Sequence, residues 1–424
     1  MKNIIVKVIL IVLLVASCAS LTMLIFLRSN ATPATEPEPS PTPTPTPTAT
    51  PKPSEAPKAE YFTISFVGDN TIASSNISSS FTNTLNGDMK YPYKNTLKYF
   101  ENDDLTIANL ECVLSDNSLS SGSMFSFKAP TSHAQILIEG SVEFVTTANN
   151  HSLDFGQKGL DDTCEALKKY GIAYGTENKT AIYETESGLK VGIYCANSSV
   201  SVSAVEAGVK SLKDQGVDYI ICALHWGSEG KYRANDTQVL VAHAAIDAGA
   251  NVVYGSHPHV LQPVEEYEDG IIFYSLGNWS FGGNNDPRDK DTAIAQVTVK
   301  RDLDGTITTD SYELIPCRLS SVSTRNDFCP TPYEKDSEEY KRTMSKLDGS
   351  FTGPDLSVDY SFMYSTPEPT QTGGETGDPG ENTDPGTNVD PGTNTEPGTN
   401  TDPGTNTEPG TNTEPATPPE TITE

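Results

Sequence analysis

Two histidines separated by one proline follow an apolar run in the second half of the chain. The run Ala250–Tyr254 is followed after two residues by His257, Pro258 and His259. Alternate side chains of an extended segment point to the same side, so this pair would present both imidazoles together. Pro258 disfavours helical backbone for the residue before it, which predicts an extended His257. Because neutral imidazole is the commonest metal-binding side chain, the pair indicates a metal-binding or catalytic use.

Similar polar residues follow other short apolar runs of the chain. The carboxyl ends of strands in an α/β sheet gather at one edge, so these residues are expected to form one shared site. Carboxylate, amide and imidazole ligands without thiolates suit Mn, Fe or Zn better than calcium. Two such ions could clamp a phosphoryl-like oxygen and activate water, while a nearby histidine protonates the leaving group. The candidates at these strand ends are Asp69, Asn109, Glu111, Asn150, His151, His225, His257 and His259.

Residues 60–365 have the length and mixed patterning of one large α/β domain. Apolar residues at spacings of three and four predict a helix over 156–171 that stops at Gly171. A second helix is predicted over 235–250, capped by Asn235 or Asp236. Short apolar runs predict strands over 61–67, 105–109, 142–148, 191–196, 217–224, 251–255 and 271–277.

Residues 1–29 combine basic residues with a long apolar run. Lys2 and Lys7 accompany about 20 apolar or small residues, enough to span a bilayer. A lipoprotein signal lipidated at Cys18 is the alternative, but the apolar run continues beyond this cysteine and favours a retained signal anchor. The lysines predict a cytoplasmic N-terminus. We therefore expect a single-pass protein of the cell membrane whose domain lies outside the cytoplasm.

Two further segments have compositions unsuited to a packed core. Residues 30–59 alternate proline with threonine, which predicts an extended linker. Residues 366–424 carry a six-residue repeat almost without apolar side chains, which predicts a disordered tail. This tail holds 12 acidic residues and no basic residue, within a chain of net charge −29. Such an acidic balance argues against nucleic acid as a partner.

Several other reactive side chains have structural explanations. Cys317 and Cys329 flank a polar loop and could form a disulfide in an oxidising exterior. His133 and His243 lie in segments with helical patterning, away from strand ends, and are expected to be structural. Arg288 could bind a substrate, but the charged run "NNDPRDKD" around it is more typical of a solvated loop.

Taken together and in order, the motifs resemble those of a known family. "GDN", "ANLE", "TANNHSLDFG", "LHWG", "YGSHPHVLQPVE" and "FYSLGNWSF" are similar to the motif series of the capsule-synthesis protein CapA family, also called the PgsA type. That family is implicated in poly-γ-glutamate synthesis and is related to calcineurin-like metallophosphoesterases. The resemblance spans about Thr63 to Phe281 and implies a four-layer calcineurin-like α/β fold. It also implies an anionic capsule polymer and membrane synthase or export proteins as partners.

The resemblance assigns roles to individual residues. His151 corresponds to a proton donor, which Asp154 would orient from one turn away. Phosphoesterases open with D-x-H, whereas Thr71 occupies the place of that histidine after Asp69, so the first metal site is expected to be weakened or altered. The residues that would bind two divalent ions are Asp69, Asn109, Glu111, Asn150, His225, His257 and His259.

Three functions remain open from the sequence. The resemblance favours synthesis, export or surface retention of an anionic capsule polymer of the poly-γ-glutamate type. A metal-dependent hydrolase of cell-envelope phosphoester or amide bonds is the first alternative. A non-catalytic scaffold of a capsule-export complex is the second. The missing D-x-H histidine favours the scaffold, whereas the five remaining motif residues, Asn150, His151, His225, His257 and His259, favour chemistry.

Overall fold

The computed structural model describes residues 58–121, 123 and 125–357. The predicted anchor over 1–29, the predicted tail over 366–424 and all but the last two residues of the predicted linker lie outside this part of the chain. Within the described residues, no helix is both long enough and apolar enough to cross a bilayer.

Two β-sheets form the centre of the fold. In the first, β1 runs parallel to β3 and antiparallel to β15. In the second, β9, β10, β11 and β13 are parallel, and an antiparallel strand closes each edge. The order in the first sheet is β17 (Thr331–Pro332), β16 (Ile307–Arg318), β15 (Asp291–Arg301), β1 (Glu60–Thr71), β3 (Leu105–Leu110), β6 (Phe144–Thr146) and β7 (Ala173–Gly175), with β14 (Asn278–Phe281) also paired to β1. The order in the second is β12 (Val264–Tyr267), β13 (Gly270–Phe273), β11 (Val252–Ser256), β10 (Tyr219–His225), β9 (Lys190–Ala196) and β8 (Lys179–Glu184). A small third sheet contains β2 (Ser74–Ser75), β5 (Phe127–Ala129) and β4 (Val113–Leu114).

Both predicted helices are present, and a capping residue marks the end of one and the start of the other. One ends at Gly171, whose φ of 77° lies in the left-handed region that glycine adopts without strain. The other begins at Asn235, whose side chain accepts the N–H of Gln238 while Gln238 caps it in return. The helices of the described chain are α2 (Ser80–Leu85), α3 (Ala134–Glu139), α4 (Gly156–Tyr170), α5 (Val202–Asp214), α6 (Asp236–Ala248) and α7 (Glu338–Leu347), with short 3₁₀ turns η1 (Tyr91–Tyr93), η2 (Leu97–Tyr99) and η3 (Thr131–His133).

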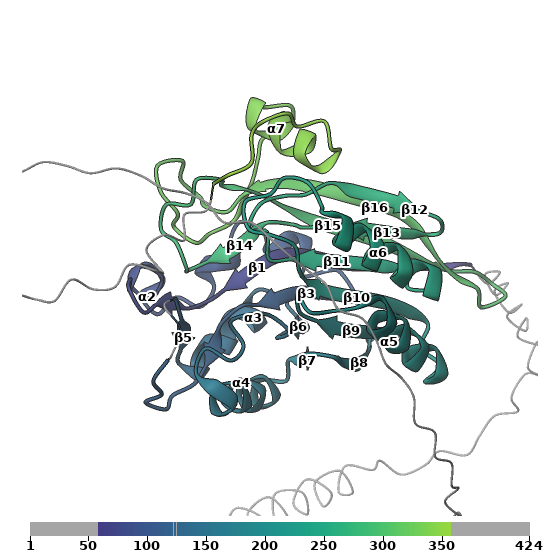
Figure 1. Ribbon diagram of the computed structural model, residues 1–424, viewed down its shortest axis with the longest axis horizontal. Helices are drawn as coiled ribbons and strands as arrows, with labels where there is room; N and C mark the ends of the chain where they lie inside the picture. Colours follow the sequence, from purple (N-terminus) through teal and green to yellow (C-terminus); the bar gives the residue numbers. More distant parts are fainter. Residues whose placement is uncertain (1–57, 122, 124, 358–424) are drawn as a thin grey trace, which may run out of the picture. The chain divides into compact units, whose positions relative to one another are not determined.

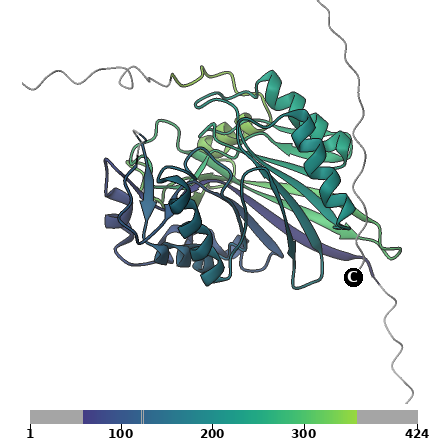
Figure 2. The same cartoon turned by 60° about the horizontal axis from the view of Figure 1, so that its bottom comes forward.

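Hydrophobic clusters show how these elements are layered. One cluster joins side chains of β1, β3 and β15 to side chains of β9, β10 and β11, so the two sheets pack face to face. A second cluster buries the apolar faces of α5 and α6 against the outer face of the second sheet. Figure 1 shows α5 and α6 side by side at one end, with α3 and α4 on the other side of the sheets, and Figure 2 shows the same arrangement from a turned view. The predicted α/β class is confirmed, and the layers run helix, sheet, sheet, helix.

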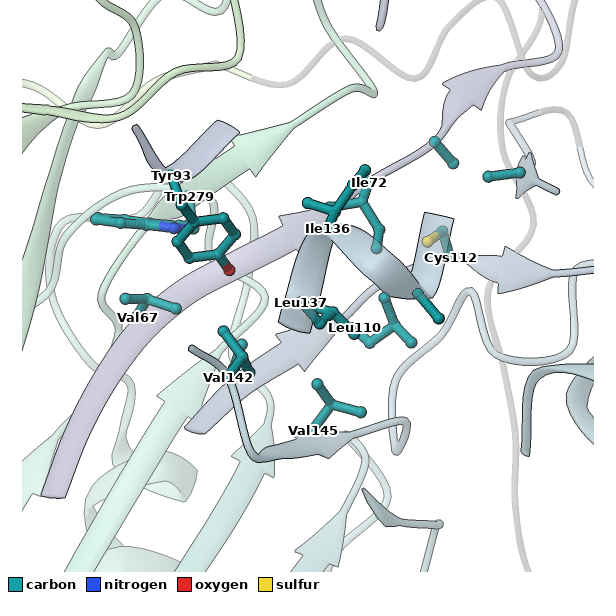
Figure 3. Close-up of a cluster of buried hydrophobic side chains, with 14 of the residues drawn as sticks. Val67, Ile72, Tyr93, Leu110, Cys112, Ile136, Leu137, Val142, Val145 and Trp279 are labelled. Carbon is teal, nitrogen blue, oxygen red and sulfur yellow. The ribbon is translucent and has the colours of Figure 1, made fainter. Parts of the chain in front are cut away.

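The outer face of the first sheet has its own core. Val67 of β1, Leu110 of β3 and Val145 of β6 lie beneath Ile136 and Leu137 of α3, as Figure 3 shows. All five side chains are buried, and burying each contributes about 1.5–3 kcal/mol relative to exposure. This packing holds α3 on β1 and β3, the two strands whose ends carry Asp69 and Glu111.

Some parts of the fold differ from the sequence-based expectations. The long antiparallel pair β15–β16, together with α5 and α7, belongs to the domain without having been predicted, and β6 is shorter than the predicted strand over 142–148. The proposed disulfide is not formed, because Cys317 and Cys329 are both free, buried thiols. His133 and His243 lie outside the site, where they contact the carbonyl oxygen of Ile72 and the carboxylate of Glu265, respectively.

Candidate metal centre

The polar strand ends come together at one edge of the two sheets. Asp69 lies opposite Asn109 in the parallel pair β1–β3, and Glu111 follows directly after β3. His225 ends β10 and lies opposite Ser256, the last residue of β11. His257 and His259 follow in the next loop, so each sheet contributes side chains to the same place. The shared site expected from the strand ends is therefore present as a cluster.

Asp69 links the two sheets at this point. Its carboxylate accepts the backbone N–H of His257 at 3.1 Å and the side-chain N–H of Asn109 at 2.8 Å. It also lies 3.2 Å from Nδ1 of His259. Burial opposes ionisation, but the hydrogen bond and the charge of His259 outweigh it and lower the pKa of Asp69 to about 2.

Glu111 is the least satisfied group of the cluster. It is fully buried, and neither of its carboxylate oxygens has a hydrogen-bond partner among the described residues. Its Oε1 lies 3.5 Å from Nε2 of His225 and 3.9 Å from Nε2 of His259. Burial, followed by the charge of Asp69, raises the pKa of Glu111 well above its usual range. A buried carboxylate without donors is costly unless a cation completes its surroundings.

The imidazoles differ in their charge state. Burial lowers the pKa of His225 well below its usual value and also lowers that of His257. Burial would lower the pKa of His259 too, but the carboxylates of Glu111 and Asp69 raise it to about 10. His225 and His257 are thus in the neutral form that binds metals, while His259 holds a proton that an ion must displace.

Outer contacts orient the His225 ring. Its Nδ1 lies 2.9 Å from the hydroxyl of Ser256, and its Nε2 lies 2.7 Å from Oδ1 of Asn150. The side-chain N–H of Asn109 also points at Nδ1, at 3.2 Å, so Nδ1 accepts and Nε2–H donates to Oδ1 of Asn150. An ion that displaced this proton would meet the Nε2 lone pair together with oxygens of Asn150 and Glu111, a mixed donor set that suits a divalent cation.

The backbone of the histidine pair is not extended, contrary to the prediction. The φ angles of His257 and His259 are 97° and 55°, in the left-handed region that non-glycine residues rarely adopt. The bond from the His257 N–H to Asp69 and the contact of His259 Nδ1 with Oδ1 of Asn278 at 2.9 Å hold this conformation. Local backbone preference is outweighed because tertiary contacts determine the loop, as is common at functional sites.

Three groups of side chains have ligand atoms close enough to hold an ion. Within each group these atoms lie within 4.8 Å of one another, and neighbouring groups share residues. Glu111 belongs to two of the groups, as a bridging acid must, and its unpartnered oxygens fit that position. The donor set is therefore compatible with a pair of divalent ions. The groups are Asp69, Glu111 and His259; Glu111, His225 and His257; and Glu229, His257 and His259.

Glu229 is a member of the cluster that the sequence analysis did not identify. It lies four residues after His225 in the loop that follows β10, so its position after a strand end was the available signal. The loop is fastened to the histidine loop by the bond from the Gly230 N–H to the carbonyl oxygen of Pro258, at 2.8 Å. Its backbone is therefore held beside His257 and His259.

The side chain of Asn109 contacts other protein side chains at both ends of its amide, whereas the sequence predicted that it would bind a metal ion. Its Oδ1 accepts the side-chain N–H of Asn149 at 3.0 Å, and its Nδ2 donates to Asp69. Both ends of the amide face protein partners, which favours a positioning role for Asn109. Asn149 was not predicted, and it also accepts the backbone N–H of His151. Asn150, by contrast, turns its amide oxygen to His225.

His151 and Asp154 lie beside the cluster in the predicted relation. Nδ1 of His151 lies 3.0 Å from the carboxylate of Asp154, which also accepts the backbone N–H of Phe127 at 2.9 Å. Both line a cavity of about 770 Å³ that also reaches Glu229 and His259. The ring of His151 is thus oriented at the wall of a space that a substrate could enter.

Glycine permits the close backbone approach on which the site depends. A Cβ atom on Gly68, directly before Asp69, would lie 2.0 Å from the carbonyl oxygen of Gly277. That carbonyl accepts the N–H of Asp69 at 2.8 Å. Any larger residue at position 68 would push β1 away from β14 and displace the Asp69 carboxylate.

The fold and the site define an α/β protein that carries a buried cluster of carboxylate and imidazole groups able to hold metal ions. Residues 63–282 match the family described as bacterial capsule synthesis protein PGA_cap, and the chain belongs to that family. The resemblance drawn from the motifs is confirmed.

Individual proteins with similar sequences include two from Bacillus. The capsule biosynthesis protein CapA of Bacillus anthracis is 29% identical over 240 residues, which cover 50% of this chain and 58% of that protein. The PGA biosynthesis protein CapA of Bacillus subtilis (strain 168) is 27% identical over 240 residues, which cover 50% of this chain and 59% of that protein. The matches thus span less than two thirds of either relative.

Among solved structures, an NAD nucleotidase of Haemophilus influenzae matches with a TM-score of 0.36 and 15% identity, over 71% of this chain and 57% of that chain.

Proposed function

We propose that this protein acts in the synthesis, export or surface retention of an anionic capsule polymer of the poly-γ-glutamate type, through a site that holds two divalent ions. Membership of the PGA_cap family supports the polymer. The observation that carries the metal site is Glu111, which is fully buried, has no hydrogen-bond partner among the described residues and belongs to two ligand groups. Mn, Fe and Zn suit this mixture of oxygen and nitrogen donors.

Each residue of the cluster has a role in this proposal. Asp69 and His259 would hold one ion, His225 and His257 with Asn150 the other, and Glu111 both. Bound there, divalent ions supply Lewis-acid polarisation of a substrate oxygen and make water a better nucleophile. Asp69 meanwhile fixes the His257 loop through its backbone N–H. Asn109 and Ser256 orient Asp69 and His225 from behind.

A second candidate function, a metal-dependent hydrolase of phosphoester or amide bonds in the cell envelope, is favoured by one arrangement. Asp154 keeps the His151 ring at the cavity wall, where Nε2 could donate a proton to a leaving group. A scaffold has no use for a histidine oriented in this way. The relation to calcineurin-like metallophosphoesterases, which the motifs imply, belongs to this candidate.

The location is also part of the proposal. The basic and apolar residues 1–29 would anchor the chain in the cell membrane, with the folded domain outside the cytoplasm. Membrane synthase or export proteins would then be its partners, and residues 30–59 would be a spacer between anchor and domain.

Elemental analysis of the purified full-length chain tests the metal site. We expect about one or two equivalents of Mn, Fe or Zn in the wild type and a large loss in Glu111→Gln and in His225→Ala. His243→Gln is the matched control, because that imidazole pairs with Glu265 outside the site. Retention of the ions in Glu111→Gln would refute the bridging assignment.

Activity assays then separate the candidate functions. Cleavage of a γ-glutamyl oligomer or a phosphoester by the loaded protein, with loss in His151→Gln, supports the hydrolase. Metal binding without cleavage, together with loss of surface polymer in cells carrying Glu111→Gln, supports a role in polymer handling. If no metal is retained after reconstitution, the scaffold becomes the better description.

A further inference from the structure

The cavity beside the cluster has polar and apolar walls. His151, His259 and Asn278 line the side nearest the cluster. Phe127 and Phe281 form an apolar wall, and their ring centroids are 6.4 Å apart. A ligand in this space would therefore meet hydrogen-bonding groups on one side and aromatic rings on the other.

Charge is distributed unevenly around this cavity. Among the described residues that line it, the acidic ones are Asp154, Glu229 and Asp289, and the sole lysine or arginine is Arg288. An anionic group that enters is repelled by the acids unless it meets bound metal ions or this guanidinium. Away from the metal site and His259, Arg288 is therefore the group of this lining at which a negative charge of the ligand can lie.

The acids of the Arg288 loop are already paired with other cations. Lys290 lies 2.8 Å from Asp286, and Lys346 of α7 lies 2.7 Å from Asp289. Asp291 is paired with both Lys346 and Arg342. Among the described residues, no carboxylate forms an ion pair with Arg288. The solvated-loop explanation predicts mutual neutralisation within the run, and Lys290 and Asp286 do pair in this way. The counter-charges of Asp289 and Asp291 come instead from α7, so Arg288 is left without a carboxylate partner among the described residues.

Arg288 is nevertheless held in place. Its Nη2 donates to the backbone carbonyl oxygen of Ser357. The segment that ends at Ser357 is itself fastened to the Glu229 loop, because the N–H of Leu356 donates to the carbonyl oxygen of Gly230 at 2.9 Å. A guanidinium has five N–H donors. The neutral carbonyl takes one, so most of the planar fork remains available for a bidentate anion.

We propose that Arg288 is a specificity-determining residue that binds a carboxylate of the ligand at the rim of the cavity. This inference rests on the proposed function, whose polymer is a chain of γ-linked glutamate units, and adds the residue that recognises its carboxylates. Each unit of such a chain carries a free carboxylate beside an uncharged amide bond. The carboxylate pairs with Arg288, and the neighbouring amide lies toward His151 in the same cavity.

The test is calorimetric binding of a synthetic γ-linked glutamate hexamer to the full-length, metal-loaded chain. Arg288→Gln should weaken binding by about tenfold or more, as expected for the loss of a charge-assisted bidentate hydrogen bond. The affinity of Arg288→Lys should lie between those of the wild type and Arg288→Gln, because lysine keeps the positive charge but lacks the planar guanidinium that binds a carboxylate through two hydrogen bonds. Arg325→Gln is the matched control, since Arg325 is also exposed but lines a different pocket. Unchanged thermal unfolding shows that each variant is folded.

Each outcome separates this inference from the proposal on which it rests. Equal hexamer affinity in Arg288→Gln and the wild type would overturn the role of Arg288 and leave the metal site and the polymer standing. If the wild type binds inorganic phosphate but not the hexamer, and Arg288→Gln loses the phosphate, the carboxylate assignment is wrong. Metal content, measured on the same samples, should not change in Arg288→Gln and reports independently on the Glu111 site.

Discussion

Glu111→Gln should make the metal-free protein more stable while abolishing metal binding. In the folded protein the carboxyl group is fully buried, has no donor among the described residues and lies near Asp69, and its pKa is raised well above the usual value. In the unfolded chain the same group ionises near pH 4.3. Folding must therefore hold a proton on Glu111, or bury its charge, at neutral pH.

The sign and size of this change in the free energy of unfolding follow from the linkage between proton binding and folding. When the pKa of a group is higher in the folded than in the unfolded protein, the group does not affect stability at pH values below its unfolded pKa. Above that pH it destabilises the folded protein by about 1.4 kcal/mol per pH unit, until the pH reaches the folded pKa. At pH 7 this sets an upper limit of roughly 3–4 kcal/mol. The glutamine side chain has nearly the same shape and does not titrate. It should recover much of this free energy, equivalent to a rise in Tm of up to about 10 °C.

The assay is urea unfolding of the wild type and Glu111→Gln in chelator, at pH 5 and at pH 7, repeated with saturating Mn or Zn. The variant's advantage should be small at pH 5 and larger at pH 7. Metal should reverse the order, because an ion at 1,000 times its Kd stabilises the wild type alone by about 4.1 kcal/mol, which exceeds the variant's advantage. Glu101→Gln, at an exposed glutamate, controls for loss of charge as such. A less stable metal-free variant at both pH values would refute the reasoning, since Glu111 would then make a stabilising contact of its own.

Three further predictions concern the surroundings of Glu111. Metal affinity should rise with pH between 6 and 8, because the raised pKa values of His259 and Glu111 keep protons in the metal-free cluster and these must leave when ions bind. Calorimetry in buffers of different ionisation enthalpy should detect net proton release on binding, and no release would contradict this reasoning. Asp154→Asn should lower kcat for any hydrolysed probe by roughly 100-fold at unchanged KM and metal content, because it removes the carboxylate that orients His151. An unchanged kcat would exclude this orienting role of Asp154. Gly68→Ala should lower the free energy of unfolding in urea by about 1–3 kcal/mol, because the new methyl group would meet the carbonyl oxygen of Gly277. A variant as stable as the wild type would show that β1 and β14 can separate freely.

Local patterns in the sequence were sufficient for much of the frame. The α/β class and the helices α4 and α6 follow from apolar spacing and from Gly171 and Asn235, which act through contacts a few residues away. The convergence of Asp69, Glu111 and His225 also follows from sequence, because parallel strands bring their carboxyl ends to one edge. The β15–β16 pair was missed since its partners are defined by register with β1.

Residue types at the ends of apolar runs identified most of the chemical groups of the site, although not Glu229 or Asn149. How these groups are used depends on contacts in the folded protein. The left-handed backbone of His257 and His259 depends on Asp69 and Asn278, and the inward amide of Asn109 depends on Asn149. The unpaired charge of Arg288 depends on a helix some fifty residues further along the chain, whose lysine neutralises Asp289. Such roles are set by contacts between residues distant in sequence, which neither spacing nor local propensity encodes.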